Sequence, residues 1–218
     1  EGHHEKIRAT EHRHGMPVRP FRDVYDFVER MCQTTYLIHK QSSLVIPNSR
    51  PFYEYLEERY NKEQIVDFEA FLFHEHYMWN SSRIRATYGT IEIRPACQQP
   101  WRDHMVVMAL NVGLIEAATE IQHYIDSTLG PDAWQIMRTY QQQAIRHGLR
   151  APQPANGFLE RILHLACAGL QSRKANEAPL LEPLFERLYR NENPAQRARR
   201  IFRSDGMAGL LRHVTIKL

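Results

Sequence analysis

Residues 88–101 read YGTIEIRPACQQPW and hold the clearest strand signal in the chain. Side chains alternate here with a period of two, so Ile91 and Ile93 lie on one face. The opposite face carries three polar residues: Thr90, Glu92 and Arg94. Pro95 ends the strand because proline has no N–H for a sheet ladder. We expect the isoleucines to pack on a helical layer, which leaves the polar face to water or to a cleft.

The residues before this strand predict short helices and antiparallel strands. Apolar spacing and turn residues place them as follows: a helix over 21–31, strands over 34–40 and 42–47 around a turn at 41–43, a short helix over 51–60, and strand runs over 83–86 and 88–94. The last two runs join through a bulge or tight turn near Gly89. The aromatic segment 64–79 fits either a helix or a buried strand.

The residues after Pro100 predict helices only. Gly and Pro punctuate the segments, which we place at 103–124, 131–147, 156–172, 178–190, 194–203 and in a short element from Gly206. Strands followed by helices indicate an α+β fold, and the short hairpin connection indicates an antiparallel sheet. We expect three parts: a loop or continuing segment over 1–19, a sheet-and-helix part over 20–130 and a helical region over 131–218.

Composition narrows the class of protein. The chain has 218 residues, 43% of them hydrophobic and 24% charged, as in an ordinary soluble protein. No apolar run reaches the roughly 20 residues that span a bilayer, and the first residues lack the apolar core of a signal peptide, so we expect a cytoplasmic protein. Phosphate-binding GxGxxG and GxxxxGK[ST] loops are missing. The cysteines, which form no CxxC pair and suggest neither a disulfide framework nor a zinc site, are Cys32, Cys97 and Cys167.

Glu92 and Arg94 carry the strongest chemical signal. The strand rise places them about 6 to 7 Å apart, so they can address two parts of one ligand. A carboxylate suits Mg²⁺, and a guanidinium suits a phosphate or carboxylate. The alternative is a solvent-exposed ion pair. Arg83 and Arg85 fall on the same side of the preceding strand, so three arginines surround Glu92 and repel one another unless an anion is present. The alternative there is a basic edge that prevents aggregation.

Residues 74–94, HEHYMWNSSRIRATYGTIEIR, resemble the signature segment of the carboxylate-amine ligase family that includes plant-type and bacterial glutamate-cysteine ligases. His74 stands nine residues before Arg83, as in the family, and GTIEIR resembles its E-x-R strand. The helix over 101–118, which follows a QxP-type loop, is similar to the next family helix. The similarity covers about residues 20–130 and corresponds to the second half of such a ligase.

The resemblance implies a glutamine-synthetase-like fold, in which an antiparallel sheet forms a cup. It implies that Mg²⁺ and ATP phosphorylate the γ-carboxylate of glutamate, and that an amine such as cysteine attacks the acyl phosphate. By position it implies these roles: Glu92 as a metal ligand, Arg94 and Arg83 as catalytic residues, and Thr90, Arg85 and His74 as ATP-binding residues. The family's other metal-binding carboxylates lie in an N-terminal half, so we expect that half, or a second chain, as a partner. Cys97 stands where the family often has an acid.

Other motifs favour ordinary structural interpretations. His74 and His76 form HxH, but no third ligand follows at zinc-like spacing. The histidines in residues 3–14 fit a solvated loop. Six arginines near the C-terminus have little aromatic interleaving and fit a solvated helical face better than a nucleic-acid site: Arg187, Arg190, Arg197, Arg199, Arg200 and Arg203. We expect neither nucleic acid nor a membrane as a partner. The alternative to a ligase is a non-catalytic binding or scaffold module.

Overall fold

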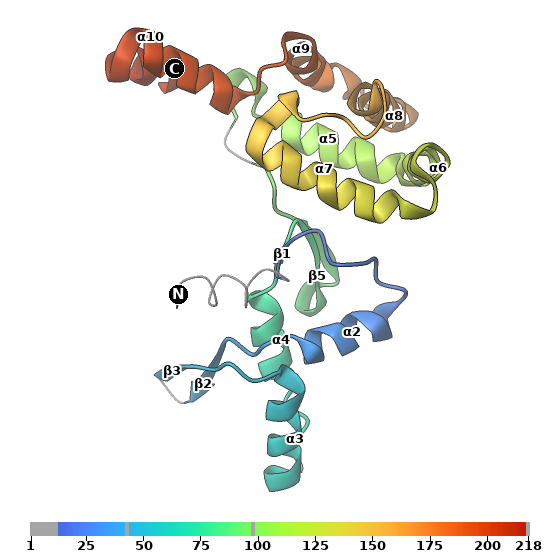
Figure 1. The fold of residues 1–218 in the computed structure, drawn as a ribbon, viewed down its shortest axis with the longest axis vertical. Helices are drawn as coiled ribbons and strands as arrows, with labels where there is room; N and C mark the ends of the chain where they lie inside the picture. The colour runs from blue at the N-terminus through green and yellow to red at the C-terminus, as the bar shows by residue number, and fades with distance from the viewer. Residues whose placement is uncertain (1–12, 42–43, 97–98, 217–218) are drawn as a thin grey trace. The chain divides into compact units, whose positions relative to one another are not determined.

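The computed structural model describes residues 13–41, 44–96 and 99–216 and has an α+β composition (Figure 1). The chain divides into two compact units, unit 1 (Glu1–Pro95) and unit 2 (Ala96–Leu218). Unit 1 holds all the described strands and unit 2 is helical. The predicted order of strands followed by helices is therefore confirmed.

Unit 1 consists of short elements. Its helices are α2 (Val24–Gln33), α3 (Phe52–Glu63) and α4 (Phe68–His76). Its strands are β1 (His14–Gly15), β2 (Ile38–Gln41), β3 (Leu44–Pro47), β4 (Trp79–Asn80), β5 (Ser82–Arg85) and β6 (Thr90–Ile93).

Side-chain caps set where two of these helices begin. The carboxylate of Asp23 accepts a hydrogen bond from the backbone N–H of Asp26, so α2 begins three residues later than predicted. Asp67 caps α4 in the same way, through the N–H of Ala70. The aromatic segment 64–79, left open between helix and strand, therefore contains a helix.

The strands of unit 1 pair two by two. β2 and β3 form the predicted antiparallel hairpin, whose turn at 42–43 lies outside the described residues. β5 and β6 are also antiparallel, with Arg83 opposite Glu92 and Ile84 opposite Ile91, and β1 pairs with β4 in parallel. A 3₁₀ turn, η1 (Ala86–Tyr88), and Gly89 at φ 60° join β5 to β6. The connection is thus a tight turn and not a bulge within one strand.

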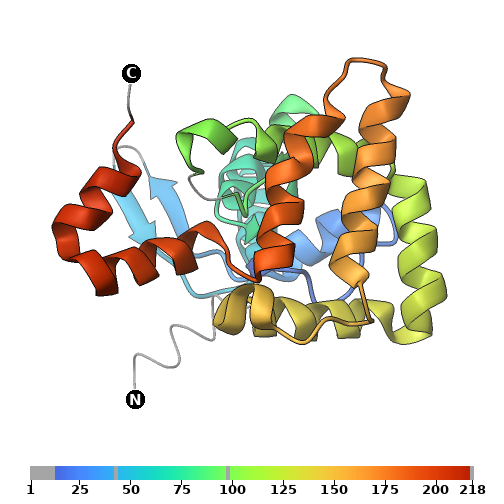
Figure 2. The same ribbon diagram turned by 90° about the horizontal axis from the view of Figure 1, so that it is seen from above.

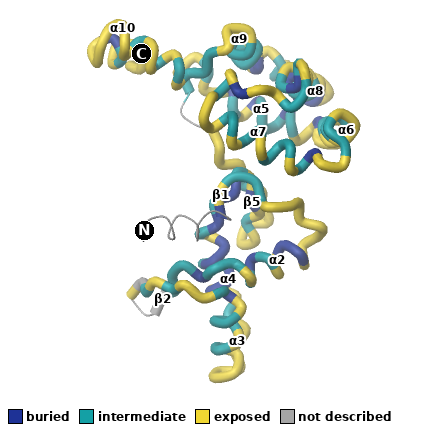
Figure 3. The backbone as a smooth tube through the Cα atoms, in the orientation of Figure 1, coloured by how far each residue is buried: buried dark blue, intermediate teal, exposed yellow. Residues whose placement is uncertain are grey.

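The core of unit 1 is aromatic and gathers α2, α3 and α4. Its buried residues include Phe27, Met31, Tyr36, Phe52 and Phe71. Figure 3 shows buried stretches in dark blue along α2 and α4, whereas the second half of α3 is exposed. The predicted cover over the strand isoleucines is incomplete, because Ile91 remains 68% exposed and Ile93 37% exposed.

Unit 2 contains only helices and 3₁₀ turns among its described residues. The helices are α5 (Val106–Glu116), α6 (Ala118–Leu129), α7 (Ala133–His147), α8 (Phe158–Ser172), α9 (Glu182–Arg190) and α10 (Pro194–Val214). The 3₁₀ turns are η2 (Trp101–Asp103), η3 (Gly130–Asp132), η4 (Gly148–Arg150) and η5 (Ala178–Leu181).

Small residues let α5 and α8 approach backbone to backbone. A Cβ added at Gly169 would lie 2.6 Å from the carbonyl oxygen of Gly113, and one at Gly113 would lie 2.5 Å from that of Ala166. Leu170 and Leu181 are fully buried beside this contact and form the core of unit 2 with Ala166. Any larger residue at these glycines would push the two helices apart.

One sequence prediction needs correction in unit 2. The predicted helix over 103–124 is two helices, α5 and α6, separated at Ala117. Apolar periodicity is the same in one long helix and in two short ones, so the break is set by packing of this turn on Gly169. The two compact units divide at 95–96, and α5 packs with α8 within unit 2, whereas the sequence predicted a boundary near residue 130. The predicted separation of the helix over 194–203 from an element beginning at Gly206 is confirmed, because Gly206 has non-helical φ 66° and ψ −166° and divides α10 into two helical segments, which Figure 2 shows as a bend in the red helix.

A helix needs about 20 mostly apolar residues to cross a membrane. No single helix among the described residues is long and apolar enough to cross a membrane. The helical stretches Trp101–Glu116 and Ala118–Arg150 meet that requirement only when taken together, across a bend of 76°.

Candidate functional site

Three arginines converge on Glu92 on the polar face of the β5–β6 hairpin. Glu92 Oε2 accepts from Arg83 Nη2 and Arg85 Nη1, both at 2.9 Å, and its Oε1 accepts from Arg94 Nη1 at 2.7 Å. We call these four residues the Glu92 cluster. Three guanidinium groups against one carboxylate leave a formal excess of two positive charges. The convergence follows from the strand alternation, but Glu92 and Arg94 contact each other directly and do not stand apart as the strand rise alone suggests.

Arg83 has a structural role within this cluster. Its side chain is only 4% exposed, and Nη1 donates to the backbone carbonyls of Glu75, His76 and Met78 at the C-terminal end of α4. Nε and Nη2 both donate to Glu92. These bonds engage backbone carbonyls at and just beyond the end of α4 and tie the helix to the hairpin. Arg83, expected to be catalytic, therefore has its donors directed at the protein itself.

Arg85 and Arg94 keep donors that no described residue satisfies. Each gives only Nη1 to Glu92, and Nε of Arg85 is buried without a hydrogen-bond partner among the described residues. The Arg85 side chain is 20% exposed and that of Arg94 35% exposed, so an anion can reach both. Arg85 also stacks over the ring of Tyr88 at 5.6 Å, which holds its guanidinium in place. Within the cluster, these two arginines are the ones suited to an anionic ligand.

The Glu92 carboxylate is held ionised. Hydrogen bonds from Arg83 and Arg85 lower its pKa to about 2, and they outweigh the opposing effect of burial. Three guanidinium groups donate four hydrogen bonds to the two carboxylate oxygens. A metal ion bound to this carboxylate would therefore lie among three cations. In addition, the described residues contain no group of three or more His, Cys, Asp or Glu able to hold a metal. Glu92 in this arrangement does not fit a Mg²⁺ ligand.

His74 lies in the aromatic core of unit 1. Its ring stacks on Phe52 at 4.4 Å, meets Tyr36 edge-on at 5.5 Å, and makes a 2.8 Å hydrogen bond from Nε2 to the carbonyl of Met31. Burial lowers its pKa to about 4, so the ring is neutral at pH 7. The contacts are those of a core histidine, whereas the family resemblance implied a residue that contacts ATP. His76, two residues on in α4, is exposed, so the HxH pair is split between two faces.

The remaining predicted residues do not form a common site. Thr90 is exposed opposite Arg85 and stands beside the Glu92 cluster. Cys97 and the histidines before Arg13 lie outside the described residues. In the C-terminal arginine series, three members form ion pairs with acids of unit 2: Arg187 with Asp103, Arg190 with Glu186 and Arg200 with Glu192. These pairs agree with the helical-surface interpretation of the series.

Glu75, which stands between the two histidines of HEH, was not among the predicted site residues. Glu75 is 2% exposed, and Oε1 of its carboxylate accepts a hydrogen bond from the backbone N–H of Ala86 at 2.9 Å. A signal was available, because Glu75 follows Phe71 by four residues and so shares its helical face. An acid on the apolar face of a helix is a feature that requires a polar partner.

Comparison of the chain with protein-family models and with curated proteins yields no match.

Proposed function

We propose that the chain is the second half of an ATP-dependent carboxylate-amine ligase of the glutamate-cysteine ligase type. In this proposal Arg85 and Arg94 bind an anionic group of the substrates, either a phosphate of ATP or a carboxylate. The observation that carries it is the excess positive charge of the Glu92 cluster, in which Arg85 and Arg94 are 20% and 35% exposed and each gives one hydrogen bond, to Glu92, among the described residues. Adding an anion would relieve the repulsion among the guanidinium groups.

In this proposal the members of the Glu92 cluster have different roles. Arg83 anchors Glu92 to the end of α4, and Glu92 orients the guanidinium groups of Arg85 and Arg94. The two arginines offset charge that develops when a carboxylate is activated as an acyl phosphate. The β5–β6 hairpin forms part of a glutamine-synthetase-like cup whose other strands come from an N-terminal half or a second chain. Mg²⁺ and ATP are the implied cofactors, with metal ligands other than Glu92 as it is arranged here.

One observation favours a second candidate, a non-catalytic anion-binding module. Glu92 accepts three hydrogen bonds on Oε2 and one on Oε1, all from arginines, so a metal ion at this carboxylate would meet the repulsion of three guanidinium groups. A sheet that kept its arginine cluster and lost its metal would bind phosphate without transferring it. The two candidates share the binding step and differ in turnover.

The test separates binding from turnover. The chain is titrated with ATP, with and without Mg²⁺, while its melting temperature is recorded, because a ligand that binds only the folded state raises that temperature. We expect Arg94→Gln and Arg85→Gln each to weaken ATP binding about tenfold, or about 1.4 kcal/mol. Arg22→Gln is the matched control, since Arg22 belongs to unit 1 but lies outside the cluster and is 73% exposed.

Turnover is measured on the full-length protein, with its N-terminal half present, as ADP release from Mg-ATP with glutamate and cysteine or another amine. Release that depends on Arg94 supports the ligase, whereas ATP binding without release supports the non-catalytic module. If ATP does not bind, or if Arg22→Gln weakens binding as much as Arg94→Gln, the anion site at the cluster is refuted.

A further inference from the structure

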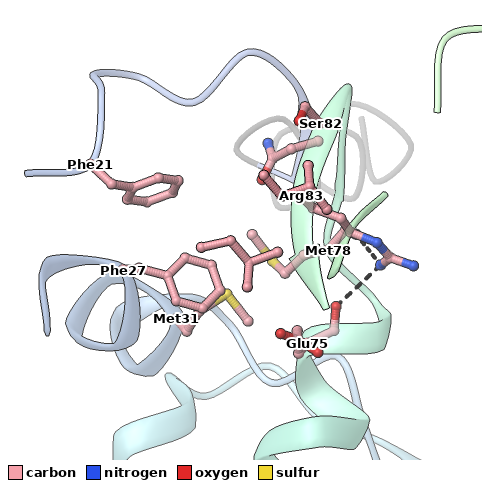
Figure 4. A pocket seen from close by; sticks show the side chains of 10 residues that line it. Phe21, Phe27, Met31, Glu75, Met78, Ser82 and Arg83 are labelled. Atoms are coloured by element: carbon pink, nitrogen blue, oxygen red, sulfur yellow. Dashed lines mark hydrogen bonds between the residues drawn. The ribbon is translucent and has the colours of Figure 1, made fainter. Parts of the chain in front are cut away.

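A separate pocket of about 180 Å³ lies in unit 1 on the isoleucine side of the β5–β6 hairpin. Figure 4 shows Phe21, Phe27 and Met31 on one side of it, opposite the strand that carries Ser82 and Arg83. Most of its wall is apolar, from these residues: Phe21, Phe27, Met31, Met78, Ile84 and Ile91. Ile91 and Phe21 are 68% and 36% exposed, so they form an open rim through which a small molecule can enter.

Glu75 places a carboxylate in this apolar wall. No Lys, Arg or His among the described residues forms an ion pair with it, and its one described hydrogen-bond donor is the backbone N–H of Ala86 on Oε1. Oε2 therefore has no donor among the described residues. A buried carboxylate is stable when a cation or several N–H groups compensate its lost hydration. The Glu75 carboxylate can therefore accept a further hydrogen bond, from a donor bound in the pocket.

Arg83 also lines the pocket, which raises the rival possibility of an anionic ligand. Its guanidinium, however, already donates to three backbone carbonyls through Nη1 and to Glu92 through Nε and Nη2. Its charge is compensated by Glu92 on the opposite face of the hairpin. Of the other polar lining residues, Asn80 donates from Nδ2 to a backbone carbonyl, and Ser82 is uncharged. The charged group of the wall without a described ion-pair partner is thus the Glu75 carboxylate, an acceptor, which favours a donor cation.

We propose that this pocket binds a small primary ammonium with an apolar tail, its –NH₃⁺ group paired with Glu75. A cavity of about 150 Å³ is known to admit benzene, so the tail can be as large as one phenyl ring. The aromatic wall adds attraction for the cation, and the thioethers of Met31 and Met78 adapt to the tail. The inference does not depend on the proposed ligase activity, because the carboxylate it uses is that of Glu75 and the arginines proposed to bind substrate, Arg85 and Arg94, do not line this pocket.

Three probes of one shape test the charge requirement: benzylamine, benzyl alcohol and benzoate. Binding to the full chain is followed by amide chemical shifts in ¹H–¹⁵N spectra. We expect benzylamine to bind and to shift resonances of Met31, Ile84 and Ala86, with benzyl alcohol at least tenfold weaker and benzoate not binding. Tighter binding of benzoate, or equal binding of the alcohol, refutes the proposal.

Two variants test the location. Glu75→Gln keeps an acceptor for Ala86 and loses the charge, so it should weaken benzylamine at least tenfold and leave benzyl alcohol unchanged. Ile91→Trp fills the pocket from its exposed rim and should abolish binding without altering the core. Ile93→Trp is the matched control, because Ile93 shares the strand face of Ile91 but is not part of the pocket wall. Benzylamine binding that survives both Glu75→Gln and Ile91→Trp overturns the assignment.

Discussion

Polar side chains inside unit 1 decide how its small core is built. Arg83 reaches the carbonyls at the end of α4, and His74 stacks in the aromatic cluster with its Nε2 on Met31. Arg13 is fully buried and donates to the carbonyl of Tyr77, and burial lowers its pKa to about 10. Strand alternation predicts the side of the sheet on which Arg83 begins. It cannot predict where a long side chain ends, because that depends on carbonyls from another element.

The buried His74 makes stability depend on pH. Its pKa is about 4 in the folded state against 6.5 when unperturbed, so the unfolded chain takes up the proton first as the pH falls. The stabilisation is complete above pH 6.5 and is lost toward pH 4, by up to about 3 kcal/mol at 1.36 kcal/mol per pKa unit. Urea unfolding of the full chain between pH 7 and pH 5 measures it.

A non-titrating variant isolates this residue. His74→Gln keeps a donor for the Met31 carbonyl, so we expect its stability to vary less with pH over that interval than that of the original chain. His76→Gln, at the exposed neighbouring histidine, should keep the original slope. Equal slopes for all three proteins would contradict the assignment.

Helices and strands follow the sequence where local chemistry decides them. Asp23 caps the helix that the pattern predicts over 21–31, and Asp67 caps α4 within the segment 64–79, whose type the pattern left open. The break at Ala117 escaped prediction because it depends on close contact with Gly169 of α8, which is distant in the sequence. Of the candidate site, the grouping of arginines around Glu92 was predictable from alternation, whereas Glu75 required knowledge of which face of α4 is buried.

The contact of α5 with α8 gives a sharp element-scale prediction. Gly169→Ala should destabilise the chain by about 1 to 3 kcal/mol, because the new methyl group would lie 2.6 Å from the Gly113 carbonyl oxygen. Ala168→Ser also adds one heavy atom but at an exposed position of the same helix, so it should change stability by less than about 0.5 kcal/mol. Thermal unfolding of both variants checks this, and similar losses would argue against a tight crossing.

At the scale of the whole molecule, the α+β class and the order of strands before helices were readable from the sequence. The division at Pro95–Ala96 was not, since it follows from which helices share a core. Unit 2 encloses its own cluster around Ala166, Leu170 and Leu181. A unit with its own core is expected to fold independently.

We therefore expect a chain of residues 96–218 to fold alone. It should show a helical circular dichroism spectrum and a single cooperative thermal transition. Introducing Gly169→Ala into this shorter chain should lower the transition temperature, which links the transition to the α5–α8 contact. A broad, non-cooperative loss of helix would show that unit 2 needs the residues before it.

The open isoleucine face of the β5–β6 hairpin has a consequence for handling the protein. β6 pairs on one side only in the described sheets, and an unpaired strand edge beside exposed Ile91 and Ile93 is a template for aggregation. Repulsion between the arginines of facing copies opposes such association, but its range shrinks from about 10 Å at 0.1 M salt to about 3 Å at 1 M. Salting-out agents also strengthen apolar contact. We therefore expect salt precipitation to favour aggregated protein and buffers of low ionic strength to keep the chains apart.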